Sequence, residues 1–334
     1  CATYNDFREL LRRKDLDAVA IATPDHWHVP IGVAAVRAGK DIYVEKPLGL
    51  TMQQNIALRK AVNKHKRIFQ YGTQQRGMAH LRYGCELVRN GRIGKVHTVE
   101  VVAPGGSAGG VKDPMPVPEG FDYDLWLGPA PVTPYTKDRC VGYGRYFIYD
   151  YSLGYVGGWG AHPLDIMQWG LDTDSTAPVE YEGTGVIPKE GLFDTITTWE
   201  VQCKYASGIQ VKFTSGRYDI TKFIGPDGWI SLSRDKAKMD AGPKSLLTSE
   251  IKAGETRLHL SDNHYQDFLR SIKSRQPTVN PVESAVRSDT ISQLSDIAIR
   301  TGRKIRWDPA KEVILGDAEA SRMLARPLRK PWKL

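Results

Sequence analysis

A lysine and a histidine are the side chains of this sequence best suited to acid–base chemistry. Lys46 follows a buried apolar segment and lies between Glu45 and Pro47. A lysine that the fold removes from water has a lowered pKa, and its amine can then exchange protons. The alternative is a surface lysine that pairs with Glu45, and the spacing alone leaves both interpretations open.

His162 opens a predicted helix, and Asp165 follows three residues later, so the two side chains can share one helical face. A histidine beside a carboxylate is a common acid–base pair. The alternative is a helix-start histidine with a solvated aspartate. His26 and His28 flank Trp27, but no other His or Cys stands at ligand spacing, so we predict no metal site.

The elements that position Lys46 are alternating strands and helices. Helical patterns at 28–38 and 51–64 separate three apolar runs, and such spacing indicates parallel βαβ units. The predicted strands cover 18–22, 41–45 and 67–71. In an open α/β sheet, ligands bind beyond the carboxyl ends of the strands. Those ends are 23–26, 45–47 and 72–76, and Lys46 lies on the second.

Beyond residue 77 the pattern changes to strands joined by short turns, which predicts an α+β domain with a largely antiparallel open sheet. The predicted strands cover 96–102, 179–186, 195–205, 209–216 and 229–233, and the predicted helices cover 265–274 and 283–301. The fold class is therefore a Rossmann-like parallel sheet, incomplete at its N-terminal side, followed by this α+β domain.

Composition excludes several classes of protein. Hydrophobic residues make up 41% and charged residues 25%, as in globular proteins, and no apolar run is long enough to span a membrane. The net charge is 46 − 38 = +8, but residues 319–334 hold five basic residues and one acidic residue, which is half of that excess. We therefore predict no nucleic-acid partner. The four cysteines form no C-x-x-C motif.

Four segments resemble the glucose-fructose oxidoreductase / inositol dehydrogenase (Gfo/Idh/MocA) family. They are Ala22-Thr23-Pro24-Asp25-His26-Trp27-His28, Val44-Glu45-Lys46-Pro47-Leu48, Asp124-Leu125-Trp126-Leu127-Gly128-Pro129 and Trp159-Gly160-Ala161-His162-Pro163-Leu164-Asp165. The resemblance implies an NAD- or NADP-dependent oxidoreductase that transfers a hydride at a CH–OH carbon of a sugar, cyclitol or related polyol. It also implies a homodimer or homotetramer formed through the C-terminal sheet.

The resemblance assigns roles by position. Lys46 and His162 are implied to be catalytic, and either would exchange the proton that accompanies hydride transfer. The residues implied to bind the cofactor are Thr23, Pro24, His26, His28, Glu45, Lys46 and Gln74. Those expected to bind substrate are Arg76, Tyr146, Trp159, His162 and Asp165. Further plausible sugar contacts, which could equally be packing or surface groups, are Tyr143, Arg145, Tyr218 and His264.

Two departures from the family pattern bear on function. Many members carry aspartate four residues before the histidine, where this chain has Gly158, so Asp165 or a substrate group would have to orient His162. An alternative is therefore an NAD-assisted enzyme that cleaves a glycosidic bond by elimination; another is a carbohydrate-binding protein that has lost catalysis. The glycine-rich turn that binds the pyrophosphate is also missing, so we infer a truncated chain whose own cofactor binding is in question.

These inferences divide the chain into three parts. We predict the remainder of a dinucleotide-binding Rossmann domain at 1–76, a substrate and oligomerisation domain at 77–303, and a C-terminal extension at 304–334 that packs back on the body. The expected location is cytoplasmic, or periplasmic if a leader precedes Cys1.

Overall fold

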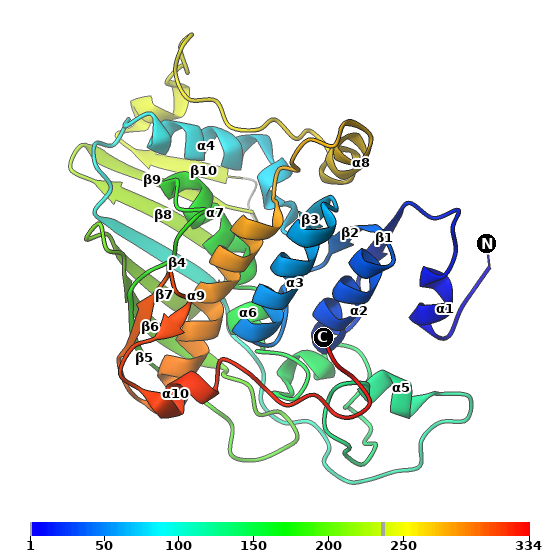
Figure 1. The fold of residues 1–334 in the computed structure, drawn as a ribbon. Helices are drawn as coiled ribbons and strands as arrows, with labels where there is room; N and C mark the ends of the chain where they lie inside the picture. Colours follow the sequence, from blue (N-terminus) through cyan, green and yellow to red (C-terminus); the bar gives the residue numbers. More distant parts are fainter. Residues whose placement is uncertain (1, 235–237) are drawn as a thin grey trace.

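The computed structural model describes residues 2–234 and 238–334. Its N-terminal part alternates helices and strands (Figure 1), as the sequence predicts. The elements are α1 (Phe7–Leu11), β1 (Ala18–Ile21), α2 (Asp25–Arg37), β2 (Asp41–Val44), α3 (Met52–His65), β3 (Phe69–Tyr71), η1 (Gln74–Gly77) and α4 (Ala79–Arg89). The three strands form one parallel sheet, sheet A, in the order β1-β2-β3. Strand β2 lies between its neighbours and is buried at every position, which explains why apolar side chains follow Asp41 without interruption in Ile42-Tyr43-Val44.

The second part of the chain forms a nine-stranded sheet, sheet B, and the helices that cover one of its faces. The strands are β4 (Thr98–Pro104), β5 (Glu180–Val186), β6 (Thr198–Lys204), β7 (Gln210–Gly216), β8 (Ile220–Gly225), β9 (Gly228–Ser233), β10 (Lys238–Gly242), β11 (Ile305–Asp308) and β12 (Val313–Ile314). The helices are α5 (Tyr123–Leu127), η2 (Gly144–Phe147), α6 (Tyr155–Gly158), α7 (Ala161–Leu171), η3 (Lys244–Thr248), α8 (His264–Ser274), α9 (Val282–Thr301) and α10 (Ala318–Arg322).

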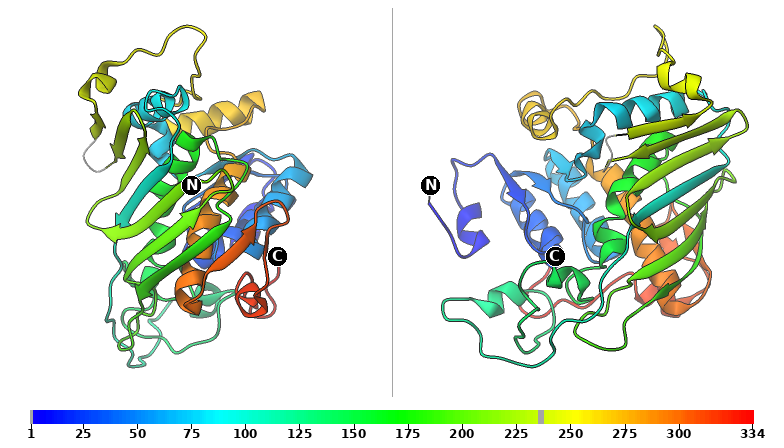
Figure 2. Two further views of the ribbon diagram at one scale, coloured as in Figure 1. Left: turned by 90° about the vertical axis from the view of Figure 1, so that its left-hand side faces the viewer. Right: turned by 180° about the vertical axis from the view of Figure 1, so that it is seen from behind.

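Sheet B is antiparallel except where β4 pairs in parallel with β7, in the order β10-β9-β8-β4-β7-β6-β5-β11-β12. The predicted fold class is confirmed. Residues of β6 alternate between exposed and buried, because α7 and α9 cover one face of the sheet and the other face is open, as the left view of Figure 2 shows. None of the described helices has the length and apolar character needed to cross a bilayer.

Helix α9 runs through the middle of the molecule between the two sheets (Figure 1) and is buried along almost its whole length. Many of its residues are nevertheless Ser, Thr or Asp. Ser288 Oγ donates a hydrogen bond to the carbonyl of Ser284 (3.0 Å), and Thr290 Oγ1 donates to the carbonyl of Val286 (2.7 Å). Hydroxyls that bond back to the preceding turn are satisfied inside the helix, so they can be buried against both sheets.

The C-terminal residues lie against the N-terminal part of the chain (Figure 1). The ring of Trp332 is 4.7 Å from that of Trp27, edge to face, and 6.3 Å from that of Phe7. Arg329 donates hydrogen bonds to the carbonyls of Gly128 and Asp124, both at 2.7 Å. The segment is thus held by aromatic packing at one point and by a guanidinium at another.

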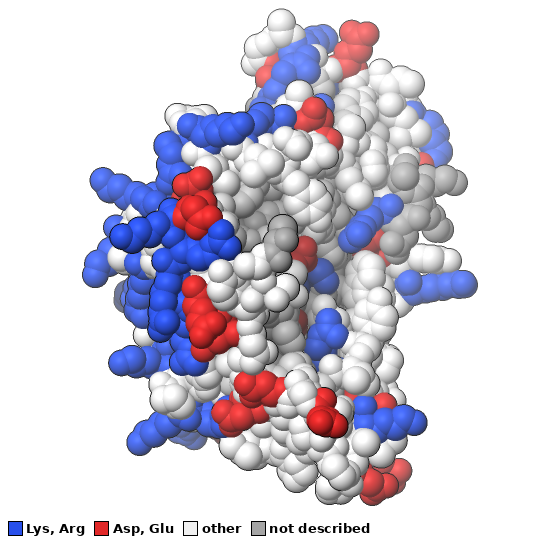
Figure 3. Space-filling model, turned by 90° about the vertical axis from the view of Figure 1, so that its right-hand side faces the viewer, with Lys and Arg blue, Asp and Glu red and all other residues white. Residues whose placement is uncertain are grey.

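Basic side chains are unevenly spread over the surface. Figure 3 views the molecule from its right-hand side in Figure 1, and Lys and Arg gather along one margin of that face, with Asp and Glu among them. The net charge of +8 is therefore carried by the body of the molecule as well as by its C-terminal residues.

A buried aspartate on α9 makes stability depend on pH. Asp289 Oδ2 accepts hydrogen bonds from Asn55 on α3 and from Gln293, whereas Oδ1 has no partner. Burial raises the pKa of Asp289 to about 6. The folded protein therefore keeps this proton to higher pH than the unfolded chain, so the contribution of Asp289 to the free energy of unfolding is largest in acid and is lost as pH rises through about 6.

We predict that Asp289→Asn removes this decline, which corresponds to roughly 3 kcal/mol for a shift of this size. Urea unfolding from about pH 4 to about pH 7 measures it. Asp113→Asn, at an exposed position, controls for the loss of one charge. Parallel pH curves for the parent protein and Asp289→Asn would contradict the prediction.

Candidate active site

The carboxyl ends of the three strands of sheet A meet at one edge, as expected for parallel strands. A buried histidine on α2 connects the first two ends. His28 Nε2 lies 2.9 Å from the carbonyl oxygen of Thr23, and its Nδ1 lies 2.7 Å from the carbonyl oxygen of Pro47. Both ring nitrogens are therefore used inside the protein. The structure gives His28 a role in holding two loops together, and its contact with a cofactor stays a prediction.

Lys46 follows a strand of sheet A and contacts a helix that belongs to the second part of the chain. Its Nζ donates a hydrogen bond to the carbonyl oxygen of Gly158 (3.0 Å) and lies 5.9 Å from the centroid of the Tyr146 ring. Burial lowers the pKa of Lys46, the negative charges of Asp25 and Glu45 oppose this, and the positive charges of Arg234 and Arg145 add to it. The alternative of a surface lysine paired with Glu45 is wrong, because the side chain is half-buried and its ammonium binds a carbonyl.

Glu45 and Gln74 contact each other at this edge. Gln74 Nε2 donates to Glu45 Oε1 (2.9 Å) and to the hydroxyl oxygen of Tyr43 (3.1 Å). The backbone N–H of Lys46 donates to Glu45 Oε2 (3.3 Å). The structure thus brings together three of the sequence-predicted residues, Glu45, Lys46 and Gln74, on the ends of β2 and β3.

His162 lies near Lys46 at the start of α7 and is 2% exposed. Arg234 Nη1 lies 3.2 Å from its Nε2, and Nδ1 has no hydrogen-bond partner. A guanidinium can only donate, so Nε2 accepts and the ring is neutral. Burial, followed by the charges of Lys46 and Arg234, holds the pKa of His162 well below its ordinary value. Trp159 packs against the ring at 5.8 Å, edge to face.

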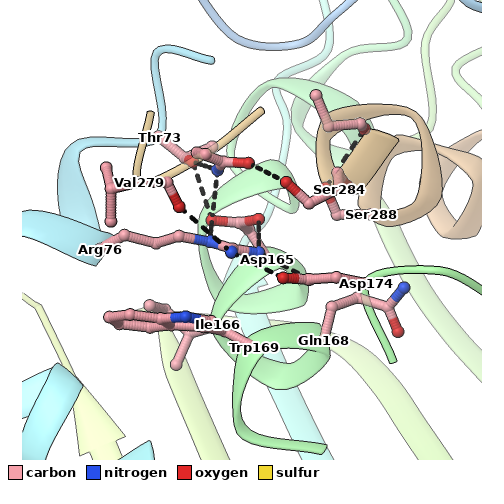
Figure 4. Close-up of polar contacts among 12 residues, drawn as sticks. Thr73, Arg76, Asp165, Ile166, Gln168, Trp169, Asp174, Val279, Ser284 and Ser288 are labelled. Carbon is pink, nitrogen blue, oxygen red and sulfur yellow. Dashed lines mark hydrogen bonds and ion pairs between the residues drawn. The ribbon is translucent and has the colours of Figure 1, made fainter. Parts of the chain in front are cut away.

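Asp165 does not orient His162. Its oxygens accept hydrogen bonds from Arg76 Nη2 (2.7 Å), Arg76 Nε (2.9 Å), Thr73 Oγ1 (2.8 Å) and Asn280 Nδ2 (2.9 Å), as Figure 4 shows. Arg76 makes a second two-pronged contact with Asp174, at 2.8 Å for each nitrogen. Arg76 and Asp165 are 1% and 0% exposed, so all their polar atoms are used inside the protein. These contacts give both residues a structural role, and their contact with a substrate stays a prediction.

Residues 23–26, which join β1 to the first turn of α2, lie beside two cavities. Thr23 and Pro24 line one of about 290 Å³ together with Trp27 and Trp126, and the buried Thr23 Oγ1 has no partner. His26 lines the other, of about 210 Å³, which the C-terminal residues 326–328 help to close. Burial lowers the pKa of His26 to about 4. Neither Lys46 nor His162 lines these two cavities, so the structure separates this loop's cavities from the acid–base pair.

Sequence reasoning missed two charged residues of the site. Asp25 opens α2, is 3% exposed and is the carboxylate that most strongly opposes the lowering of the pKa of Lys46. Its position directly after a strand end was an available signal. Arg234 follows β9, and its contact with His162 depends on the order of strands in sheet B, for which the local sequence holds no signal. Among the described residues, no cluster of His, Cys, Asp and Glu could hold a metal.

A parallel Rossmann-type sheet joined to an open, largely antiparallel sheet defines a class of two-domain NAD-binding oxidoreductases, and comparison with known proteins identifies the family. Residues 1–73 match the model described as oxidoreductase family, NAD-binding Rossmann fold. Residues 107–334 match the model described as oxidoreductase family, C-terminal alpha/beta domain. The chain belongs to the Gfo/Idh/MocA oxidoreductase family.

Individual relatives share shorter segments. The chain is 31% identical to the uncharacterized oxidoreductase YrbE of Bacillus subtilis over 99 residues, which are 30% of this chain and 29% of YrbE. It is 32% identical to levoglucosan dehydrogenase of Pseudarthrobacter phenanthrenivorans over 92 residues, or 28% of this chain and 24% of that enzyme. It is 46% identical to glycosyl hydrolase family 109 protein 1 of Shewanella sp. over 54 residues, or 16% and 12%. The chain thus matches less than a third of the length of these curated relatives.

Solved structures share the fold over most of the chain. A levoglucosan dehydrogenase in complex with NADH and levoglucosan superposes with a TM-score of 0.67 at 15% identity, covering 91% of this chain and 83% of that one. The aldose-aldose oxidoreductase of Caulobacter crescentus gives a TM-score of 0.64 at 20% identity, with the same coverage. At these identities the likeness shows the fold.

The buried guanidinium of Arg76 supports a stability prediction. Arg76→Met leaves Asp165 buried without its cation, and such a change costs about 3–5 kcal/mol. We expect a fall of that size in the free energy of unfolding, measured with urea. The double variant Arg76→Met/Asp165→Asn removes the stranded charge and should recover part of the loss. A double variant no more stable than Arg76→Met would show that the charge is not the cause.

Proposed function

We propose that this chain acts as an NAD- or NADP-dependent oxidoreductase on a CH–OH group of a sugar, cyclitol or related polyol, and that it contains the residues that bind the substrate. The observation that carries the proposal is the contact between Lys46 and the carbonyl of Gly158, four residues before His162. This contact supports the proposal because the partly desolvated amine follows a Rossmann-type strand and its charge acts on the imidazole of His162. Similarity to dehydrogenases of sugars and cyclitols supports the substrate class.

We assign the proton of the reacting hydroxyl to Lys46 rather than to His162. Lys46 is half-buried and its pKa is lowered, so the neutral amine that can accept a proton is within easier reach than in water. His162 is neutral, almost fully buried, and its Nε2 already accepts from Arg234. Its contact with Arg234 holds that guanidinium in place while Lys46 moves the proton.

The residues present fit one end of a dinucleotide. Glu45, Lys46 and Gln74 lie together at the strand ends, and the buried Thr23 Oγ1 has no partner, as expected of a group that awaits a ligand. In the described parts of sheet A, no glycine-rich turn joins a strand to a helix to cradle a pyrophosphate. A bound nicotinamide would accept or supply the hydride. We therefore propose NAD(H) or NADP(H) as the cofactor of this oxidoreductase.

A second candidate function is NAD-assisted cleavage of a glycosidic bond. Glycosyl hydrolase family 109 proteins share 46% identity with this chain over 54 residues, and Gly158 leaves His162 without a carboxylate on the preceding helical turn. The two functions differ in their products. An oxidoreductase forms one reduced cofactor per substrate, whereas the glycosidase releases product with catalytic amounts of NAD and no net NADH.

Lys46 gives the proposal its test. Oxidation of an alcohol should accelerate as pH rises and Lys46 loses its proton, with a midpoint below the ordinary lysine pKa, and ketone reduction should slow. Lys46→Arg keeps the charge but cannot exchange protons in this range, so kcat should fall by about 10²–10⁴-fold and this limb of the pH profile should vanish.

Cofactor absorbance with a panel of sugars and cyclitols measures these rates, and Lys60→Arg, on the exposed side of α3, is the matched control. A gene product that reduces no cofactor with any member of the panel contradicts the oxidoreductase. Unchanged ligand affinity and unchanged biological activity in Lys46→Ala would instead favour a carbohydrate-binding protein.

A further inference from the structure

Three cationic side chains converge on the candidate active site from separate segments. Lys46 follows β2, Arg145 lies on η2 and Arg234 follows β9. The charges of both arginines lower the pKa of Lys46, and the charge of Arg234 also lowers that of His162. Only groups that are close and poorly screened influence each other in this way, so the site gathers positive charge from both domains.

Arg145 lies against the tyrosine that faces Lys46. Its guanidinium carbon is 4.8 Å from the centroid of the Tyr146 ring, and Lys46 Nζ is 5.9 Å from the same centroid. Arg145 Nη1 donates to the carbonyl of Gly142, but its Nε is buried without a hydrogen-bond partner. A buried N–H of a permanent cation costs free energy when no acceptor binds it, and a ligand with an acceptor oxygen would remove this cost at Arg145 Nε.

Arg234 supplies the second guanidinium. One of its nitrogens contacts His162 Nε2 (3.2 Å), and its central carbon lies 5.8 Å from the centroid of the Trp159 ring. The side chain is half-buried. Within the described parts of the chain, neither Arg234 nor Arg145 has a carboxylate at ion-pair distance, whereas Arg76 nearby has two.

The carboxyl groups near Lys46 do not balance these charges. Asp25 is 3% exposed, and burial raises its pKa even though the charges of Lys46 and Arg145 act against this. Glu45 accepts hydrogen bonds from Gln74 and from the backbone of Lys46. Two carboxyl groups therefore lie near the three cations. Glu45 accepts hydrogen bonds from neutral donors, and burial opposes the ionisation of Asp25.

We propose that the site takes an anionic carbohydrate, a sugar that bears a carboxylate or a phosphate, with Arg145 and Arg234 as the groups that recognise the anion. The planar fork of a guanidinium matches both anions through paired hydrogen bonds. The Trp159 and Tyr146 rings offer faces on which a sugar can pack. The inference deepens the proposed function, because it names the substrate class for the site around Lys46.

Gly158, whose carbonyl binds Lys46, would accept a side chain without steric conflict. A β-carbon built on Gly158 would meet only Tyr146 Cδ1 at 3.8 Å and Tyr155 Cδ1 at 4.0 Å, which is ordinary van der Waals contact. An aspartate at this position would introduce a negative charge there.

Binding to this chain itself tests the inference without any turnover. Calorimetric titration compares D-glucuronate, D-galacturonate and D-glucose 6-phosphate with D-glucose and D-galactose at millimolar concentrations. We expect the anionic sugars to bind more tightly, with affinity that falls as ionic strength rises. Comparing the two uronates with D-glucose 6-phosphate shows whether the site prefers a carboxylate or a phosphate. Equal binding of the acids and their neutral counterparts, or no binding of any acid, overturns the inference.

Variants locate the anion. Arg145→Gln and Arg234→Gln should each raise the Kd for the anionic sugar by roughly 10- to 100-fold, the range for a hydrogen bond to a charged group. Arg234→Lys should lose less, because it keeps the charge. Gly158→Asp should weaken the acids and leave neutral sugars unchanged. Arg257→Gln, an exposed arginine bonded to the backbone of Ile251, is the control. Loss of affinity only in that control would contradict the assignment.

The two proposals fail separately. A gene product that oxidises neutral sugars as well as their acids retains the oxidoreductase function and rejects the anionic substrate. Binding of acids that depends on Arg145 and Arg234, without reduction of any cofactor by the gene product, retains the anion site and rejects the oxidoreductase.

Discussion

The buried ion pair between Arg76 and Asp165 holds the two halves of the site in place. Arg76 follows the last strand of sheet A, and Asp165 lies on α7, three residues after His162. Thr73 and Asn280 donate to the same carboxylate, so a strand end, a loop and a helix meet at one group. A fully buried pair of charges tolerates little displacement, because each charge left unpaired is costly. The position of His162 relative to Lys46 follows from this contact.

The glycine-rich segment before α7 completes this constraint through three different roles. A β-carbon on Gly160 would lie 2.1 Å from the carbonyl oxygen of Val156, so this junction between α6 and α7 requires glycine. A β-carbon on Gly157 would lie 3.6 Å from Pro47, which shows how closely α6 approaches the Lys46 loop. Gly158 supplies the carbonyl for Lys46. One short segment thus sets the spacing between α6 and α7, their approach to Pro47 and the hydrogen bond to Lys46.

The sequence was sufficient where local patterns determine structure. Apolar runs that end in Thr23-Pro24 and Glu45-Lys46 predicted parallel strands and the edge where ligands bind, and β1 and β2 lie there. It was insufficient where the outcome depends on distant partners. The spacing of His162 and Asp165 indicated a shared helical face, but Arg76, 89 residues away, determines where the carboxylate points. Likewise β4 pairs with β7 across more than a hundred residues, and Arg234 reaches His162 only through that sheet.

In the reaction and substrate that we propose, the same positive charges act on two different negative charges, and this separates binding from catalysis. A hydroxyl that loses its proton to Lys46 develops negative charge on oxygen, and fixed cations stabilise that charge in the transition state. An anionic substituent on the sugar carries its charge already in the ground state, so its interaction with Arg145 or Arg234 contributes equally before and during reaction. Stabilisation of the reacting oxygen therefore acts on kcat, whereas recognition of the substituent acts on Kd. The charges of both arginines lower the pKa of Lys46. Among these three cations, Lys46 is the one that could lose its proton in the proposed reaction.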